Sequence, residues 1–252
     1  MDRLKGKVVI VTGAASGIGA VFSQALAAEG AQLILADIAN GEGTADAIVR
    51  NGGLARFVST DVSDKDSVGE MVATAVSEFG RIDGLVNNAA IFASLNKKPF
   101  LEIDPSEWDK VMDVNVRGPF LCSQAVAPHM ISQNHGKILN IASGTVFKGM
   151  AGMLHYVSSK GAVVAMTRCL ARELGASGVC VNAIAPGLTM SENVATNPTW
   201  QGKGAEATVA SRAIPRSQVP ADLIGALLFF CSQDSDFVTG QTLVVDGGAV
   251  MK

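Results

Sequence analysis

The chain has 252 residues, of which 48% are hydrophobic and 17% charged, and its formal net charge is −3. A chain of this length and apolar content can form one large domain with a substantial core. The small negative charge, without any basic block, argues against nucleic acid as a partner. No apolar run reaches the roughly 18 residues of a membrane span, so we expect no membrane association.

The cysteines are scattered, without a Cys-x-x-Cys motif or zinc-ligand spacing; they are Cys122, Cys169, Cys180 and Cys231. We therefore expect free, buried thiols in a reducing cytoplasm and no metal site.

The first strand is expected at 7–12, which is apolar and β-branched. A glycine-rich loop, Thr12-Gly13-Ala14-Ala15-Ser16-Gly17-Ile18-Gly19, leads into a helical pattern that lasts to about Glu29, and a second strand at 31–36 ends at Asp37. Strand, glycine loop, helix, strand and acid follow one another in the order of a dinucleotide site. The glycines let the main chain approach a pyrophosphate, the helix N-terminus offers free N–H groups, and the acid can accept both hydroxyls of the adenosine ribose.

A secretory signal peptide is the rival interpretation of this segment, because Arg3, Lys5 and Lys7 precede the apolar stretch. The loop glycines interrupt the apolar run where such a peptide should be continuous, and the acidic Glu29 and Asp37 follow. We therefore favour the dinucleotide site.

Strand-like and helix-like segments alternate along the rest of the chain, with no linker or internal repeat. Further strands are expected at 54–59, 83–87, 136–142, 178–184 and 242–246, and helices at, among others, 64–79, 106–132, 152–176 and 220–232. This alternation predicts a single α/β domain over residues 1–252, a doubly wound parallel sheet of the Rossmann type with about seven strands and helices on both faces. Ligands bind such sheets at the carboxyl ends of the strands.

Polar residues follow the later strands at those carboxyl ends. Asp61-Val62 follows the third strand, Asn87-Asn88-Ala89-Ala90 the fourth, Ser143 the fifth and Pro186-Gly187 the sixth. Each has an ordinary explanation by itself, such as a turn or a helix cap. Their joint occurrence at successive strand ends favours one shared binding site.

Tyr156 is the only tyrosine of the chain and lies four residues before Lys160. A helix places residues i and i+4 on one face, so the phenol and the ammonium should project side by side. A nearby cation favours phenolate and lowers the pKa of the phenol, which would make Tyr156 a proton donor and acceptor. Taken alone, the pair is equally consistent with an ordinary helix surface.

Together these motifs resemble the short-chain dehydrogenase/reductase family along nearly the whole chain. The family's glycine motif matches residues 12–19, and its Asn-Asn-Ala-Gly segment matches 87–90 with an alanine in the last place. Its catalytic asparagine and serine match Asn115 and Ser143, and the serine stands at the family's spacing of thirteen residues before Tyr156. The segment that lies over the nicotinamide in the family matches Pro186-Gly187, followed by Ser191 where a threonine is usual.

The resemblance implies hydride transfer between nicotinamide and a carbinol carbon, with the catalytic residues Asn115, Ser143, Tyr156 and Lys160. Tyr156 would exchange the hydroxyl proton, Ser143 would bind the same oxygen, and Lys160 would lower the pKa of the tyrosine and bind the nicotinamide ribose, so that no metal is needed. The implied cofactor-binding residues are Gly13, Ser16, Gly17, Ile18, Gly19, Asp37, Ile38, Asp61, Val62, Asn88, Ala89, Tyr156, Lys160, Pro186, Gly187, Thr189 and Ser191. Asp37, without a basic residue at 14, 15 or 38, indicates NAD rather than NADP as the cofactor.

A separate argument for a role of Asn115 comes from Pro119. Proline has no N–H, so the carbonyl of Asn115, four residues earlier, loses its helical partner. That carbonyl could hold a water bound to Lys160, the role that the resemblance implies; an ordinary proline kink is the alternative.

We therefore predict an NAD-dependent dehydrogenase of a secondary alcohol, or the matching ketone reductase, with a substrate lid near 188–216. Segments 213–220 and 239–243 resemble bacterial aryl-alkyl alcohol dehydrogenases such as 1-phenylethanol dehydrogenase. One alternative is a 3-oxoacyl reductase of lipid synthesis, against which Asp37 argues. Another is a catalytically inactive regulatory protein on the same fold, against which the intact catalytic set argues.

The helix expected at 152–176 is apolar around much of its circumference, so one sheet cannot cover it. The family forms tetramers. We predict a homotetramer built on a dimer that pairs this helix and the one expected at 106–132.

Overall fold

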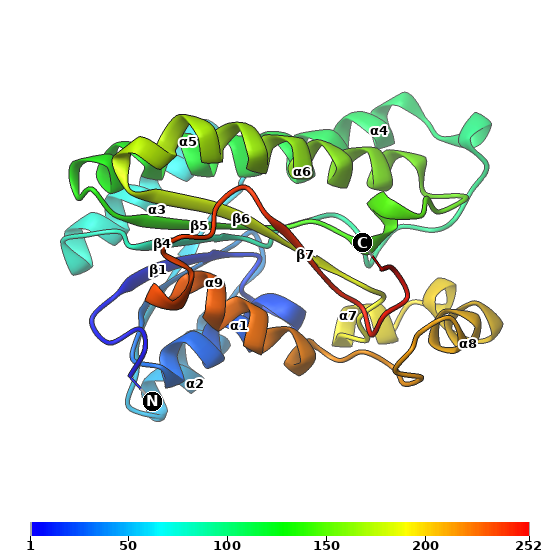
Figure 1. Cartoon of the computed structure of the whole chain (residues 1–252), viewed down its shortest axis with the longest axis horizontal. Helices are drawn as coiled ribbons and strands as arrows, with labels where there is room; N and C mark the ends of the chain where they lie inside the picture. The colour runs from blue at the N-terminus through cyan, green and yellow to red at the C-terminus, as the bar shows by residue number, and fades with distance from the viewer. Residues whose placement is uncertain (1, 252) are drawn as a thin grey trace.

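The computed structural model describes residues 2–251, and its centre is one sheet of seven parallel strands (Figure 1). The strand order is β3-β2-β1-β4-β5-β6-β7, so the chain moves outward from β1 in one direction and then from β4 in the other. The strands are β1 (Val8–Thr12), β2 (Gln32–Asp37), β3 (Leu54–Ser59), β4 (Gly84–Asn87), β5 (Gly136–Ile141), β6 (Val179–Pro186) and β7 (Thr242–Val245). The predicted doubly wound sheet is confirmed, and each strand end lies within two residues of its expected place.

Helices cover both faces of the sheet (Figure 1). Val9 and Val11 pack into the core on one face, whereas Ile10 packs into the core on the other, because successive side chains of a strand point to opposite faces. The first core is closed by α1 (Gly17–Ala28), α2 (Glu42–Arg50) and α9 (Ile224–Cys231). The second is closed by α3 (Lys65–Phe79), α5 (Gly118–Ser132) and α6 (Leu154–Leu174).

The segment expected as one helix at 106–132 is interrupted, so that part of the prediction was wrong. Its order is α4 (Pro105–Met112), a π-helical turn (Asp113–Arg117) and α5. Pro119 cannot donate an N–H to the preceding turn, and the N–H of Gly118 bonds instead to the carbonyl of Asp113, five residues back. The widened turn places Asn115 in the interior, where it is fully buried.

The helix expected at 220–232 begins with a 3₁₀ turn, Pro220–Leu223, before α9. The carboxylate of Asp222 accepts the N–H of Val219 and pairs with Arg216, which fixes the start of this turn. Helices α7 (Glu192–Ala195) and α8 (Lys203–Ala210) follow β6, and short 3₁₀ turns lie both before and after this strand.

The segment 188–216 lies beyond one end of the sheet, where α7 and α8 are seen in Figure 1. The buried guanidinium of Arg212 ties its two ends together by donating to the carbonyls of Leu188 (2.8 Å) and Arg216 (2.6 Å). The N–H of Met190 bonds to the carbonyl of Gln218. The segment therefore closes on itself and forms one wall over the carboxyl ends of the strands.

No helix within residues 2–251 combines the length and hydropathy that crossing a bilayer requires.

Candidate active site

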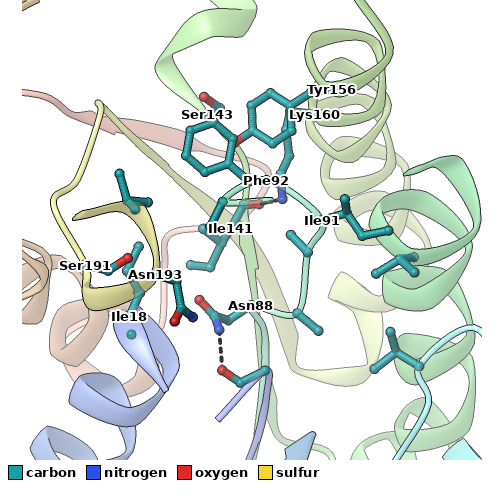
Figure 2. Close-up of a pocket in the computed structure, with 18 of the residues that line it drawn as sticks. Ile18, Asn88, Ile91, Phe92, Ile141, Ser143, Tyr156, Lys160, Ser191 and Asn193 are labelled. Carbon is teal, nitrogen blue, oxygen red and sulfur yellow. Dashed lines mark hydrogen bonds between the residues drawn. The ribbon is translucent and has the colours of Figure 1, made fainter. Parts of the chain in front are cut away.

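A long cavity of about 870 Å³ runs along the carboxyl ends of the strands (Figure 2). Its walls come from the glycine loop, from the residues after β2 to β6, and from α4, α6 and the segment 188–216. The predicted residues that line it are Gly13, Ser16, Gly17, Ile18, Asp37, Ile38, Asp61, Val62, Asn88, Ala89, Ser143, Tyr156, Lys160, Pro186, Gly187, Thr189 and Ser191. Gly19 and Asn115 are the predicted residues that lie behind its wall. Sequence positions far apart thus meet in one cavity.

The glycine loop is packed closely against the end of β4. A Cβ on Gly13, whose φ is +66°, would lie 2.8 Å from the Cα of Ala89, and one on Gly19 would overlap the carbonyl oxygen of Gly13. Asn88 donates its side-chain amide to the carbonyls of Thr12 and Gly13, both at 3.0 Å (Figure 2). The loop is held open toward the first turn of α1, where free N–H groups can receive a pyrophosphate. Gly19 therefore contributes to the site by allowing the close packing of the loop and does not itself line the cavity.

Asp37 is fixed by main-chain donors at the end of β2. Its Oδ2 accepts the N–H of Ala15 and its Oδ1 the N–H of Ala39, both at 2.9 Å. A carboxylate has about four acceptor sites, so two remain for other donors. Ile38 beside it is 75% exposed and offers an apolar surface. Of the described residues that line the cavity, the lysines and arginines are Lys110 and Lys160, and neither is next to Asp37 in the chain.

Asp61 is held similarly after β3. Its Oδ1 accepts the N–H and the hydroxyl of Ser63 at 2.9 and 2.6 Å, and its neighbour Val62 is 6% exposed. The free Oδ2 of Asp61 can accept a donor from a ligand in the cavity.

Tyr156 and Ser143 form the polar centre of the cavity. Ser143 ends β5 and Tyr156 lies in the first turns of α6, and each is only 6% exposed. Burial raises the pKa of Tyr156 to about 12, and the hydrogen bond from Ser143 opposes that rise. At neutral pH the phenol therefore carries its proton, and the two hydroxyls lie together (Figure 2).

Lys160 is 3% exposed, and its Nζ donates to the carbonyl of Ile141 at 2.7 Å (Figure 2). Burial lowers the pKa of Lys160 to about 8. The Nζ lies 5.9 Å from the centre of the Tyr156 ring. The expected proximity is present, but the expected lowering of the tyrosine pKa is not, because desolvation of the phenol outweighs any attraction from this ammonium.

Asn115 acts as a tie between two elements. Its Oδ1 accepts the N–H of Ile91 at 2.7 Å, and its Nδ2 donates to the carbonyl of Ile91 and to Ser159 Oγ at 3.2 and 3.1 Å. Ser159 Oγ in turn donates to the carbonyl of Tyr156 at 2.7 Å. The side chain thus fixes the loop after β4 to α6, while the role expected for its own carbonyl stays a prediction.

Comparison with known proteins agrees with this geometry. The family model described as enoyl-(acyl carrier protein) reductase matches residues 13–250. The short-chain reductase protein NovJ of Streptomyces niveus is 41% identical over 247 residues, which cover 96% of this chain and 93% of NovJ. The 3-oxoacyl-(acyl-carrier-protein) reductase FabG of Thermotoga maritima is 36% identical over 99% of this chain and 100% of its own. The crystal structure of levodione reductase has a TM-score of 0.92 at 32% identity and covers 97% of this chain and 98% of its own.

The chain belongs to the short-chain dehydrogenase/reductase family. It is therefore an oxidoreductase of a family that generally uses NAD or NADP on small-molecule substrates. Within residues 2–251 of this short-chain dehydrogenase/reductase, no group of three or more His, Cys, Asp or Glu side chains is placed to hold a metal ion. Ala90, the departure from the family's Asn-Asn-Ala-Gly segment, is exposed on the cavity wall.

Sequence reasoning missed residues that this short-chain dehydrogenase/reductase brings to the cavity. The Phe92 ring lies 4.8 Å from the Tyr156 ring and 4.5 Å from the Trp200 ring, between centroids (Figure 2). Asn193 donates to Ser16 Oγ at 2.9 Å, which joins α7 to the glycine loop. A lone aromatic in a loop and a contact across 177 residues leave no periodic signal in a sequence. The one feature of the sequence that could have indicated Phe92 is its position just after the segment 87–90, which follows the fourth strand.

Proposed function

We propose that the protein is an NAD-dependent oxidoreductase that interconverts a secondary alcohol and its ketone, with Tyr156 as the acid and base. The observation that carries the proposal is the buried pair of hydroxyls, Ser143 and Tyr156, at the centre of a cavity long enough for a dinucleotide. A pair of hydroxyls aimed at one point suits a carbonyl oxygen, which accepts two hydrogen bonds.

The residues of the cavity fit a nicotinamide dinucleotide. The glycine loop leaves no space for a Cβ at Gly13, and the helix behind it presents main-chain donors for a pyrophosphate. Asp37 would take the adenosine ribose hydroxyls, Asp61 the adenine amino group, and Lys160 the nicotinamide ribose, in the set of cofactor-binding residues that the sequence predicts. When bound, the cofactor supplies or accepts the hydride. The carboxylate of Asp37, with no adjacent cation, favours NAD over NADP.

Tyr156 is the group that donates or accepts the proton. In ketone reduction the protonated phenol gives its proton to the carbonyl oxygen, while the Ser143 hydroxyl donates to the same oxygen and orients it. The raised pKa of Tyr156 keeps the donor form populated at neutral pH. In alcohol oxidation the same phenol must first lose its proton, so oxidation should be favoured by alkaline pH.

The substrate's second substituent should be apolar. Phe92 and Trp200 stack beside Tyr156, and Leu188 and Met190 pack against the same cluster. Of the described residues that line the cavity, Lys110 and Lys160 are the cations, and Lys97 Nζ lies 5.4 Å from the centre of the Trp200 ring. A flat apolar group, such as the phenyl ring of an aryl-alkyl ketone, would gain contact there without burying an unpaired charge.

The 3-oxoacyl reductase remains the second candidate, because FabG of Thermotoga maritima is a relative over the whole chain. That reaction as a rule uses NADPH and an acidic carrier protein. The surroundings of Asp37 favour NAD over NADP, and for this reason the 3-oxoacyl reductase is the second candidate.

We further propose that residues 1–252 act as one dinucleotide-binding and catalytic domain, with 188–216 as the substrate lid, and that the protein is a cytoplasmic homotetramer. Its four cysteines are free, which suits a reducing compartment, but only Cys122 and Cys231 are buried as expected, whereas Cys169 is exposed and Cys180 half-buried. Phe120 of α5 and Leu154 of α6 are 46% and 47% exposed, and α5 and α6 cover the same face of the sheet (Figure 1). These apolar side chains would be covered by the dimer contact.

An NADH absorbance assay tests the proposal. We expect oxidation of NADH with a phenyl alkyl ketone and little turnover with NADPH or a 3-oxoacyl thioester. Tyr156→Phe should keep the fold and NADH binding but lose about 10²–10⁴-fold in kcat. NADPH-dependent reduction of the thioester alone would favour the second candidate, and a Tyr156→Phe variant with most of its kcat would remove Tyr156 from the role of acid and base.

A further inference from the structure

The hydroxyl of Ser143 has three polar neighbours. The N–H of Thr145 lies 3.3 Å from Ser143 Oγ, and the hydroxyl of Thr145 lies 2.9 Å from it. The third neighbour is the phenol of Tyr156, beside which Ser143 lies at the centre of the cavity (Figure 2) and whose pKa Ser143 lowers. Three partners are the full capacity of a serine hydroxyl, which has one proton and two acceptor sites.

Only one assignment of protons uses all three contacts with Ser143 as the donor to Tyr156. A main-chain N–H can only donate, so it fills one acceptor site of Ser143. When the hydroxyl of Thr145 donates as well, it fills the second site. The single proton of Ser143 is then left to point into the cavity, where Tyr156 lies and where the substrate oxygen would bind.

We propose that Thr145 is a positioning residue that orients the Ser143 hydroxyl, so that its single proton points into the cavity, at Tyr156 when no substrate is bound and at the substrate oxygen when one is. The catalytic meaning of this inference rests on the proposed function. Thr145 itself need not touch the substrate; it acts through Ser143.

The local structure makes the arrangement rigid. Ser143 is in extended backbone (φ −159°) and caps a 3₁₀ turn, Gly144–Phe147, in which Thr145 is the second residue. Gly144 is buried against the end of β6, where an added Cβ would lie 3.3 Å from the carbonyl oxygen of Pro186. Both hydroxyls are therefore carried by one short turn that is packed between β5 and β6. Among the described residues, the hydroxyl of Thr145 has Ser143 as its hydrogen-bond partner and no other.

The simpler explanation is that the main-chain N–H of Thr145 caps the turn and that its hydroxyl contributes nothing. Thr145→Val separates the two, because it keeps the N–H and the shape of the side chain and removes only the hydroxyl. Thr145→Ser restores the hydroxyl without the methyl group and is the matched control.

The ionisation of residue 156 provides a readout that needs no turnover. Because Tyr156 is the only tyrosine, uniform replacement of tyrosine by 3-fluorotyrosine gives a single ¹⁹F signal. The fluorine makes the phenol more acidic and brings its titration to milder pH. The charged groups that face this region are Lys160 on α6 and Asp246 after β7, whose Oδ2 lies 3.5 Å from the Cβ position of Gly144, and neither changes among the variants.

The test measures the ¹⁹F pKa in the wild type, Thr145→Val, Thr145→Ser, Ser143→Ala and the double variant Ser143→Ala/Thr145→Val. We expect Thr145→Val to raise the pKa by about half a unit or more, because the donor from Ser143 is no longer oriented. Thr145→Ser should return it to the wild-type value. In the Ser143→Ala background, Thr145→Val should change nothing, since the effect passes through Ser143.

An unchanged pKa in Thr145→Val, or an equal shift in the Ser143→Ala background, would overturn the inference. Turnover reports on the two proposals separately. An inactive wild type whose ¹⁹F pKa responds as expected would reject the proposed function and keep Thr145 as the residue that orients Ser143. An active enzyme without the ¹⁹F response would do the reverse.

Discussion

Lys160 should make the stability of this protein depend on pH in a direction opposite to that of a lysine whose pKa is raised by an ion pair. Burial lowers the pKa of Lys160 to about 8 from the 10.5 of an exposed lysine. Between those two values the unfolded chain binds a proton that the folded chain does not, so the free energy of unfolding rises with pH in this window. The gap corresponds to about 3 kcal/mol in total, of which about 2 kcal/mol falls between pH 7 and pH 9.8.

The measurement is urea unfolding of the wild type and Lys160→Met at several values between pH 7 and 9.8, without cofactor. Subtracting the two free energies of unfolding cancels the other titrating groups, and the upper limit stays below the raised pKa of Tyr156. The wild type should gain about 2 kcal/mol relative to the variant as the pH rises. Lys65→Met, at an exposed lysine of α3, serves as the control and should show no such trend. A difference that stays constant with pH would mean that Lys160 is not desolvated in the folded protein.

Three further outcomes test the proposed function. The wild type should prefer NADH over NADPH by at least about 100-fold in kcat/KM, because the carboxylate of Asp37 would contact the 2′-phosphate of NADPH and like charges at contact cost several kcal/mol. Asp37→Ala with Ile38→Arg should move the preference toward NADPH, and near parity in the wild type would remove Asp37 from the site. Phe92→Ala should lower kcat/KM for a phenyl ketone about tenfold relative to a short aliphatic ketone, because it removes apolar contact, whereas Phe100→Ala, at a side chain that is 65% exposed, should leave the ratio unchanged. Phe120→Glu should break the proposed tetramer in sedimentation by placing a charge in its contact; a wild type that sediments only as a monomer would contradict the tetramer.

The strands were predictable because buried parallel strands are continuous apolar runs between glycine, proline and polar residues. Val8–Thr12 is an example, in which every residue is buried. Gly136–Ile141 is also buried throughout, although it contains Lys137 and Asn140. The break between α4 and α5 was not predicted, because the apolar periodicity continues through it. What decides it is a single missing N–H at Pro119, which changes the hydrogen-bond pattern of the turn before it. The same proline predicts a carbonyl of Asn115 without its helical partner, but one missing hydrogen bond does not by itself predict a π-helical turn.

Some properties of the candidate site follow from the spacing of residues in the sequence, whereas others depend on the surroundings that the fold creates. A four-residue spacing fixes that Tyr156 and Lys160 share one side of a helix, and the structure places them there. The direction in which the pKa of the tyrosine shifts depends instead on atoms from other elements. These are the carbonyl of Ile141, which accepts a hydrogen bond from the ammonium of Lys160, and the ring of Phe92, which covers the phenol. Both groups are removed from water together, so each is pushed toward its neutral form. A phenol that keeps its proton until a substrate oxygen arrives is suited to donate it, and Ser143 is the one neighbour that draws its pKa downward. Burial of the phenol, more than the lysine that the motif pairs with it, therefore decides the direction in which the pKa of Tyr156 shifts.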